Sequence, residues 1–216
     1  MNFPIIIIGA GGHAVSVSNV AISCQYDVIA FVDDHKVGSA VLNKPVISSK
    51  HFITDFHQCN ICIAIGDNAT RETIYEEYKR KLPNIKFPVL VHQSSIIGEG
   101  STIGEGSVVM PLVNIGPNSI IGNGCIINSN ASIDHDCNMG DFASIAPGVV
   151  CGGGVTIGKR SAISIGATIK HNIVIGKDTV IGGGSYVHAS VEDEVVAYGN
   201  PSKKIRNRKK DDPYLM

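Results

Sequence analysis

The chain has 216 residues, enough for one or two domains that each contain a hydrophobic core. Its formal net charge is −1, so no overall positive field favours nucleic acid or an anionic membrane surface as a partner. No run of about 20 apolar residues and no cleavable signal pattern is present, which predicts a cytoplasmic protein without membrane insertion. The 24 glycines and the low share of charged residues, 17%, indicate a turn-rich architecture.

The first ninety residues alternate strand-like and helix-like segments. Strands are expected at residues 4–8, 28–32 and 61–65, with one helix ending near residue 22 and another over residues 70–81. Strands that alternate with helices predict a parallel sheet, and ligands of such sheets bind at the carboxyl ends of the strands. Gly or Asp occupies the turns at that edge, so we expect a binding site there.

The first of these turns approaches a nucleotide-binding fingerprint. Residues 9–14 are close to the pattern G-x-G-x-x-G/A, and the acidic pair Asp33 and Asp34 follows about twenty residues later. About ninety residues are too few for both halves of a dinucleotide-binding fold, which favours a nucleotide attached to a small group. The alternative is that Gly11 and Gly12 only allow the strand and helix to pack closely.

The second half of the chain repeats every six residues. An anchor residue, usually Ile or Val, recurs from residue 91 to residue 187 through seventeen successive hexads. The second position is Gly in nine of them, and the fifth is small or β-branched. Each hexad predicts one short strand and a corner, and three hexads predict one triangular coil of a β-helix. Gly at the corners is expected to supply backbone conformations that other residues reach only with strain.

The chain is therefore predicted to have two domains. An α/β domain with a small Rossmann-like parallel sheet covers residues 1–88, and a parallel β-helix with a C-terminal tail covers residues 89–216. The boundary lies in the segment 83–88, which begins and ends with proline.

One segment of the repeats carries residues suited to catalysis. His135 is at the third place of its hexad, an outward corner position, and Asp136 beside it can accept a hydrogen bond from the imidazole. One coil is eighteen residues, so Gly153 should lie one coil along, at about 4.8 Å. A base next to an exposed N–H can bracket a carbonyl under attack and hold its oxyanion. A solvated surface histidine is the alternative.

Cysteines and a second histidine offer other chemistry. Cys59 and Cys62 form a CxxC that we interpret as structural, because Cys62 lies in a buried strand and no second CxxC exists. His171 continues the His135 column, as in the solenoid carbonic anhydrases, but their third histidine position is Gly176 here. No metal is therefore predicted. Cysteines 125, 137 and 151 occupy inward positions, which leaves no acyl carrier.

Nearly the whole chain resembles bacterial nucleotide-sugar acetyltransferases of the PglD and NeuD type. The resemblance rests on the segments 9–14, 31–34, 64–68 with Arg71 nearby, 134–136 and 198–205. It implies a left-handed β-helix of hexapeptide repeats and a homotrimer with active sites between neighbours. It also implies acetyl-CoA-dependent N-acetylation of the C4 amine of a UDP-4-amino-4,6-dideoxy-sugar, as in UDP-N,N'-diacetylbacillosamine synthesis. The transfer would be direct.

Several alternatives stay open. The acceptor is alternatively a dTDP- or GDP-linked amino sugar, or sialic acid acetylated on oxygen. A non-catalytic solenoid that only binds a nucleotide sugar is a rival from another class.

The resemblance also implies roles for individual residues. His135 corresponds to the base, Asp136 to the acid that orients it, and Gly153 to the donor at the acetyl carbonyl. Residues expected at the nucleotide sugar are Gly11, Gly12, His13, Asp33, Asp34, Gly66, Asn68 and Asn128. Residues expected at acetyl-CoA are Ser144, Gly153, Gly154, Ala167, Gly183, Pro201 and Lys204. Relatives often carry His where this chain has Ser144, and Ser cannot serve as a second base.

The C-terminal tail is strongly basic. Residues 203–210 hold six basic side chains in eight positions. Two interpretations are equally open: a solvated terminus, or a contact with the phosphates of CoA.

Overall fold

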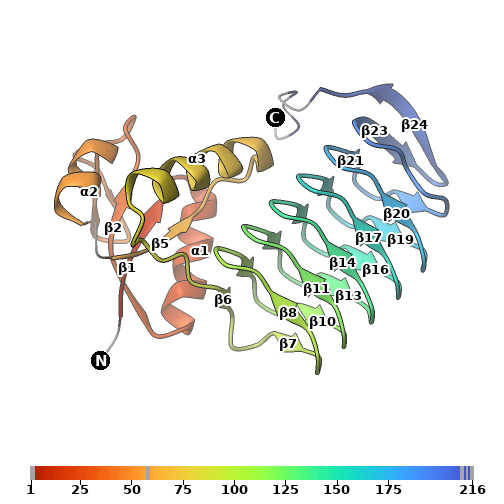
Figure 1. The fold of residues 1–216 in the computed structure, drawn as a ribbon, viewed down its shortest axis with the longest axis horizontal. Helices are drawn as coiled ribbons and strands as arrows, with labels where there is room; N and C mark the ends of the chain where they lie inside the picture. The colour runs from red at the N-terminus through yellow and green to blue at the C-terminus, as the bar shows by residue number, and fades with distance from the viewer. Residues whose placement is uncertain (1–2, 57–58, 210–211, 213, 215–216) are drawn as a thin grey trace.

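The computed structural model describes residues 3–56, 59–209, 212 and 214. The α/β domain has one sheet with the strand order β3-β4-β2-β1-β5, in which only the β3–β4 pair is antiparallel (Figure 1). Its strands are β1 (Phe3–Ile8), β2 (Tyr26–Val32), β3 (Ala40–Val41), β4 (Lys44–Ile47) and β5 (Asn60–Ile63). Its helices are α1 (Gly12–Ser23), α2 (Ser49–Asp55) and α3 (Asn68–Lys81). Within the described residues, no helix is long and apolar enough to cross a membrane.

The predicted parallel sheet is confirmed, with two additions. The sequence pattern did not predict the β3–β4 hairpin or helix α2. The hairpin turns at Leu42 and Asn43, which both have positive φ, as expected for a two-residue turn that matches the twist of the strands. Helix α2 begins after Ser48, whose side chain accepts a hydrogen bond from the His51 N–H. Both elements are too short for hydrophobic periodicity to reveal them.

The second domain is a left-handed parallel β-helix with three faces. Face 1 contains β6 (Leu90–Val91), β9 (Val108–Val109), β12 (Ile126–Ile127), β15 (Ser144–Ile145), β18 (Ala162–Ile163) and β21 (Val180–Ile181), and continues into β23 (Val195–Gly199) and β24 (Ser202–Asn207). Face 2 contains β7 (Ile96–Ile97), β10 (Asn114–Ile115), β13 (Ser132–Ile133), β16 (Val150–Cys151), β19 (Thr168–Ile169) and β22 (Tyr186–Val187). Face 3 contains β8 (Thr102–Ile103), β11 (Ile120–Ile121), β14 (Asn138–Met139), β17 (Thr156–Ile157) and β20 (Val174–Ile175). The corners between them are named here corner 1–2, corner 2–3 and corner 3–1.

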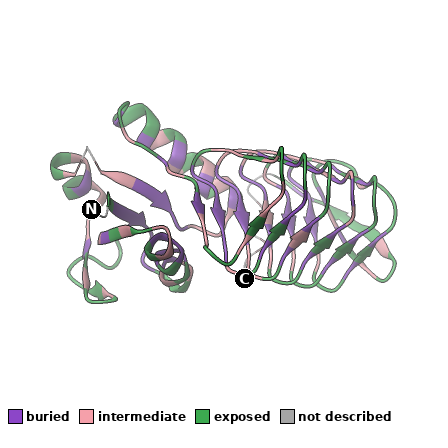
Figure 2. Cartoon of the chain, turned by 90° about the horizontal axis from the view of Figure 1, so that it is seen from below, coloured by how far each residue is buried: buried purple, intermediate pink, exposed green. Residues whose placement is uncertain are grey.

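The eighteen-residue coil predicted from the hexads is confirmed by the strand register. Ile115 pairs with Ile133, and Ile133 pairs with Cys151, so anchors stack one coil above another. The anchors and the small fifth-position residues fill the interior of the solenoid (Figure 2). Cysteines 125, 137 and 151 are free and buried there, as predicted. A fifth-position serine such as Ser107 is also buried, because its hydroxyl donates to the Gly122 carbonyl (2.8 Å) and accepts from the Cys125 N–H (2.9 Å).

The expected reason for glycine at the second hexad position is wrong. None of these glycines has positive φ, and the left-handed residues occupy the fourth position instead, as Gly100 and Asn118 do. The second-position glycines are required by space. A Cβ on Gly158 would lie 2.4 Å from the Lys177 backbone nitrogen of the next coil. Stacking of the coils, and not backbone conformation, therefore excludes a side chain there.

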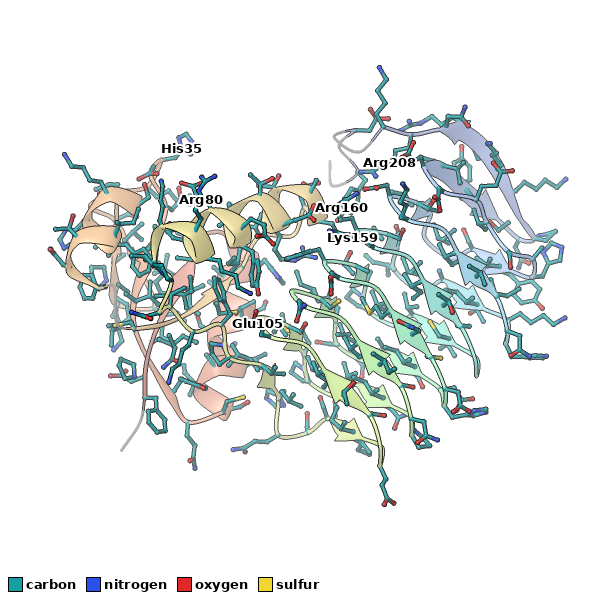
Figure 3. The ribbon with its side chains drawn as sticks, in the orientation of Figure 1. His35, Arg80, Glu105, Lys159, Arg160 and Arg208 are labelled. Atoms are coloured by element: carbon teal, nitrogen blue, oxygen red, sulfur yellow. The ribbon has the colours of Figure 1, made fainter. Side chains whose placement is uncertain are left out.

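The two domains share an extensive junction. Helix α1 packs on β6 and β9, and helix α3 runs along corner 3–1. On this corner Arg160 donates to Glu72 of α3 (2.9 Å) and also pairs with Asp178 (2.5 Å), and both carboxylates are largely buried. Lys159 pairs with Glu72 as well (2.5 Å), and Figure 3 shows Lys159 and Arg160 beside the end of α3. The junction is therefore built from ion pairs as well as apolar contacts.

Candidate active site

Corner 2–3 brings His135, Asp136 and Gly153 together, as the eighteen-residue spacing predicts. The Nδ1 atom of His135 lies 2.6 Å from Oδ2 of Asp136. A Cβ on Gly153 would lie 2.6 Å from Nε2 of His135, so only glycine leaves room for the imidazole on this coil. The His135 side chain is 56% exposed and its Nε2 edge faces away from Asp136. Reactive nitrogen and glycine backbone thus share one open surface.

The charges on this corner favour a basic imidazole. A hydrogen bond to Asp136 raises the pKa of His135 above its ordinary value, and the negative charge of Asp134 adds to that rise. The hydrogen bond from His135 in turn lowers the pKa of the Asp136 carboxyl. The Asp134 side chain also accepts a hydrogen bond from the His135 backbone N–H (2.8 Å), which stabilises the turn at this corner. The contact orients the His135 ring and leaves Nε2 as its free nitrogen.

The backbone N–H of Gly153, at the third position of its hexad, is available to a ligand. Neighbouring amides are used between coils: Gly152 donates to Ile169, and Gly154 donates to the His135 carbonyl (2.9 Å). The Gly153 N–H has no partner within the described part of the chain. Proline, which lacks an N–H, occupies this same position at residues 111, 117 and 147. A donor next to His135 is therefore a consequence of the coil geometry.

These groups surround a cavity of about 340 Å³, called here the corner cavity. It is lined by Asp134, His135, Gly152, Gly153, His171 and Asn172. The two histidines of the column thus share one space. No group of three His, Cys, Asp or Glu side chains suited to holding a metal ion occurs among the described residues.

A second cavity of about 420 Å³, the edge cavity, lies at the carboxyl ends of the parallel strands, where the sequence predicts nucleotide binding. Its lining includes Asp33 and Asp34 together with Gly9. Asp34 accepts from both the backbone and the hydroxyl of Ser49 (2.8 Å each), which lowers its pKa. An oriented, ionised carboxylate at this edge suits the hydroxyl groups of a ribose.

The glycine-rich turn is open above the sheet. A Cβ on Gly11 or Gly12 would meet no atom within 4 Å, so close strand–helix packing does not explain these glycines. Gly9 is the residue that close approach requires, because it has a φ of +108° and its Cβ would lie 3.0 Å from the Ala64 carbonyl oxygen. His13 follows, mostly buried. Its Nε2 has no partner in the described chain, and burial and then the charge of Arg71 lower its pKa to about 4.

A third cavity of about 410 Å³, the face cavity, lies on face 1 beside corner 1–2. It is lined by Asn128, Ser144, Ala146, Ala162, Ile163, Ser164, Ile165 and Tyr214. Two residues expected at different ligands, Asn128 and Ser144, therefore meet in one cavity. Asn128 and His135 do not meet, because they lie on different corners, at opposite ends of one side of the coil.

The other predicted residues are dispersed. Asn68 is 1% exposed, and its amide donates to the carbonyls of Arg160 and Ser161 (3.0 and 3.1 Å), so it holds the domain junction. Ala167 is completely buried in the solenoid interior, which leaves only its backbone for a ligand. Lys204, on β24 near the C-terminal end of the solenoid, pairs with Glu192 (2.8 Å). Gly154 is on corner 2–3, Gly183 on corner 1–2, Gly66 on the β5–α3 turn, and Pro201 follows a cis peptide bond in the β23–β24 turn.

The sequence predicted no role for two residues that contact the domain junction or line a cavity. Arg71 is 1% exposed and donates to five oxygen atoms across the domain junction. Tyr214 lines the face cavity from the C-terminal tail. Neither has a periodic signal, because one lies on the buried side of a polar helix and the other follows the last hexad.

The chain matches two known families and several solved structures. Residues 4–78 match the PglD N-terminal domain, and residues 100–135 match the bacterial transferase hexapeptide family (six repeats). PerB from Caulobacter crescentus, solved with CoA and GDP-perosamine, is 32% identical with a TM-score of 0.89, over 94% of this chain and 97% of that one.

Two further solved structures are similar to this chain over nearly its whole length. The acetyltransferase domain of PglB from Neisseria gonorrhoeae, in complex with acetyl coenzyme A, is 33% identical over 95% of this chain and all (100%) of that domain, with a TM-score of 0.89. WeeI from Acinetobacter baumannii is 28% identical, with a TM-score of 0.87 over 94% of this chain and 100% of that one. The chain belongs to the PglD-type family of nucleotide-sugar acetyltransferases. It is therefore an acetyltransferase built on hexapeptide repeats.

Proposed function

We propose that the protein acetylates the C4 amine of a UDP-linked 4-amino-4,6-dideoxy-sugar, with acetyl-CoA as co-substrate and His135 as the general base. The observation that carries this proposal is the corner with His135, Asp136 and the Gly153 amide. The nucleotide would occupy the edge cavity, where Asp33 and Asp34 lie. A product of this type serves the synthesis of diacetylbacillosamine-type glycans.

The transfer proceeds in one ternary complex. Nε2 of neutral His135 takes a proton from the attacking amine as nitrogen bonds to the thioester carbonyl carbon. The Gly153 N–H donates to the oxyanion that forms. When the intermediate collapses, the carbon–sulfur bond breaks, and the imidazolium returns its proton to the departing CoA thiolate. Asp136 holds the imidazole by its other nitrogen throughout.

A covalent acyl-enzyme is disfavoured by the state of the nearest cysteines. Cys137 and Cys151 are both buried in the solenoid, and burial raises the pKa of both thiols. A thiol with a raised pKa is not a thiolate at neutral pH, so neither residue suits an acyl carrier. Direct transfer agrees with this arrangement.

A homotrimer would complete the site. Asn128 in the face cavity and His135 in the corner cavity lie on separate corners of one chain, so a single chain leaves the expected acceptor contacts apart from the base. Solenoids packed side by side would bring the corner cavity of one copy to face 1 of its neighbour. Acetyl-CoA, a long thin molecule, would then lie between two copies.

A GDP-linked amino sugar is the second candidate acceptor. PerB, solved with GDP-perosamine, is 32% identical to this chain over almost its whole length. A dTDP-linked sugar or sialic acid O-acetylation is a weaker candidate. A non-catalytic scaffold is weaker still, because the grouping of His135, Asp136 and Gly153 on one corner supports a catalytic role.

The first experiment is a thiol-release assay with acetyl-CoA and UDP-, GDP- and dTDP-linked 4-amino sugars, with free sialic acid as a fourth acceptor. We expect turnover with one nucleotide-linked amino sugar. Turnover with sialic acid alone would replace N-acetylation by O-acetylation. Binding of a nucleotide sugar without thiol release from any acceptor would leave the scaffold as the better interpretation.

His135→Ala tests the base directly. We expect kcat to fall by roughly 10²–10⁴, because general-base catalysis contributes about that much. His51→Ala is the matched control, since His51 is an exposed histidine of α2 that pairs with Asp55 and stacks on Phe56, away from corner 2–3. Near-full activity of His135→Ala would remove His135 from the mechanism.

A further inference from the structure

The tail that follows β24 returns from the far end of the solenoid to the α/β domain. Its described residues Arg208, Lys209, Asp212 and Tyr214, called here the strap, lead back toward the N-terminal end of helix α3 (Figure 1). Tyr214 bonds there to Asn68, the first residue of α3, although the two are 146 positions apart in the sequence. The strap therefore connects two parts of the chain that the repeats keep apart.

The path of the strap is fixed by contacts with the solenoid and within the strap itself. Arg208 is 5% exposed, and its guanidinium donates to the carbonyls of Asp178 (2.9 Å) and Asp212 (2.8 Å). The Asp212 carboxylate pairs with Arg206 of β24 (3.0 Å). The Arg208 guanidinium also lies 5.4 Å from the centre of the Tyr214 ring, within the range of a cation–π contact. Tyr214 is therefore held at a defined place beside face 1.

The Tyr214 hydroxyl uses its hydrogen-bonding capacity within the protein. It donates to the Gly66 carbonyl and accepts from the Asn68 N–H, both at 3.2 Å. The Ser144 hydroxyl of β15 also bonds to the phenol oxygen, and burial raises the pKa of Tyr214, which keeps the phenol protonated. A hydroxyl group has one donor and two acceptor positions, so these three partners fill them. The hydroxyl thus joins a strand of the solenoid to the β5–α3 turn.

The contact with Asn68 completes the N-terminal cap of helix α3. The first N–H groups of a helix have no partner inside the helix. Asp67, the N-cap residue, covers one of them, because its side chain accepts from the Thr70 N–H (2.9 Å). The Asn68 N–H is covered by Tyr214 instead. A side chain of the strap therefore stabilises the start of a helix in the other domain.

The turn that Tyr214 holds is also a wall of the edge cavity. Ile65 and Thr70, on either side of Gly66 and Asn68 in the sequence, both line that cavity. Tyr214 itself lines the face cavity and is not part of the edge lining. Its effect on a ligand in the edge cavity therefore passes through the backbone of the turn. A wall that is already ordered before binding lowers the entropic cost of binding.

We propose that Tyr214 is a positioning residue for nucleotide binding, because the strap holds the β5–α3 turn in the conformation that receives the nucleotide. The inference rests on the proposed function, which places the nucleotide in the edge cavity. Without the Tyr214 hydroxyl the turn populates further conformations, and the apparent affinity falls with the fraction of protein in the competent one. The strap thus makes a site of the α/β domain depend on the far end of the solenoid.

The test compares Tyr214→Phe and a deletion of residues 210–216 with the matched control Tyr26→Phe. Phenylalanine keeps the ring in the wall of the face cavity and removes only the hydroxyl. Tyr26 of β2 lies outside the described linings of the edge, face and corner cavities. Calorimetry measures Kd for UDP and GDP and the melting temperature, hydrogen exchange measures the protection of residues 64–72, and kinetics measures KM for acetyl-CoA.

The hydroxyl contributes neutral hydrogen bonds. Their loss in Tyr214→Phe predicts a roughly two- to tenfold rise in Kd for the nucleoside diphosphate that the unmodified protein binds more tightly. Exchange at residues 64–72 should accelerate by a similar factor, and the deletion should have larger effects on both. KM for acetyl-CoA should change by less than about twofold in Tyr214→Phe, because the wall of the face cavity is kept. Tyr26→Phe should change none of these quantities.

Three results would overturn the inference. A lower melting temperature with an unchanged Kd for the nucleoside diphosphate would mean that the strap only stabilises the fold. Weaker binding of the nucleotide sugar with unchanged binding of the free nucleoside diphosphate would place the effect at the sugar. Weaker nucleotide binding with unchanged exchange at residues 64–72 would exclude the turn as the connection. Absence of thiol release by the unmodified enzyme would instead contradict the proposed function, while nucleotide binding and exchange would still decide the role of Tyr214.

Discussion

In the proposed mechanism, two adjacent residues have different tasks. His135 presents Nε2 to the open corner. Its Nδ1 lies 2.6 Å from the carboxylate of Asp136, a residue whose backbone φ is 56°. A non-glycine residue with positive φ is uncommon, but Asp tolerates it better than most residues. The left-handed turn places the carboxylate beside the imidazole of the preceding residue.

The pH profile should therefore report this contact. Asp136 raises the pKa of His135 above 6.5, and only the neutral imidazole is a base, so kcat should fall as the pH drops through that raised pKa. Asp136→Asn removes the negative charge, so the pKa falls and the acidic limb of the kcat profile moves to lower pH. The plateau should also be lower, because the base is weaker and less well oriented.

Asp134→Asn tests the smaller of the two effects on the pKa of His135 and is compared with Asp136→Asn. Asp134 raises the pKa of His135 less than Asp136 does, so the limb should move in the same direction by a smaller amount. Steady-state rates at saturating substrates between about pH 5 and 9 measure both shifts. An acidic limb that stays in place in both variants would mean that another group controls it.

Other left-handed residues serve the domain junction. Phe142, Arg160 and Asp178 all occupy the fourth hexad position on corner 3–1, with φ between 52° and 58°. This conformation costs bulky residues of the order of 1–2 kcal/mol each. Contacts with the α/β domain offset the strain: the Phe142 ring lies 5.2 Å from that of Tyr75, and Arg160 binds Glu72.

At the scale of elements, the hexad is a unit of stacking. All second positions on corner 3–1 from residue 104 to residue 176 are glycine, whereas corner 1–2 carries His92, Met110, Asn128 and other side chains there. The coils are closest where glycine occurs, since a Cβ on Gly158 would approach the Lys177 nitrogen at 2.4 Å. The repeat pattern thus records how tightly each corner is packed.

Gly158→Ala tests this interpretation. The added methyl group meets backbone atoms that have no freedom to move aside, so we expect destabilisation of about 1–3 kcal/mol, as for overpacking in a core. Lys170→Ala at the second position of corner 2–3 is the control, because that position already accommodates an exposed side chain. Chemical denaturation measures both. Equal stability of Gly158→Ala and the unmodified protein would contradict the steric argument.

At the scale of the whole molecule, Arg71 connects the two domains. Its Nε donates to Gly124 (2.7 Å) and one Nη to Phe142 (2.8 Å), both on the solenoid. The other Nη donates to Ile65 and Gly66 in the turn between the edge cavity and the face cavity. A buried guanidinium without a facing carboxylate is stabilised here because each of its N–H groups finds an oxygen.

Arg71→Lys should therefore weaken the junction. Lysine keeps the charge but has three donors on one nitrogen, so it leaves buried carbonyls unsatisfied at about 1–3 kcal/mol each. We expect a lower melting temperature for the α/β domain in calorimetry and weaker nucleotide binding. Arg80→Lys, an exposed arginine on the same helix (Figure 3), should change neither. An unchanged melting temperature for Arg71→Lys would show that the junction does not depend on the guanidinium hydrogen bonds of Arg71.

The repeats were predictable because each hexad carries its own signal. An anchor every six residues and a small fifth residue specify coil, register and interior, so Gly153 could be placed beside His135 from spacing alone. The parallel sheet and its carboxyl edge followed from the alternation of strands and helices, which again is a local pattern. The separation of Asn128 from His135 followed only once the three faces were assembled.

The sequence by itself determined the repeat strands, the longer strands and helices of the α/β domain, and the grouping of His135, Asp136 and Gly153 on one corner, because those follow from local or regularly spaced patterns along the chain. Only the tertiary structure decided how the domains meet, since Arg71, Arg160 and Glu72 find their partners tens of residues away. It also decided that the Tyr214 hydroxyl bonds to the Gly66 carbonyl, although the two residues are 148 positions apart in the sequence. Contacts of that kind follow from packing free energy summed over the whole molecule, and no short-range pattern encodes them.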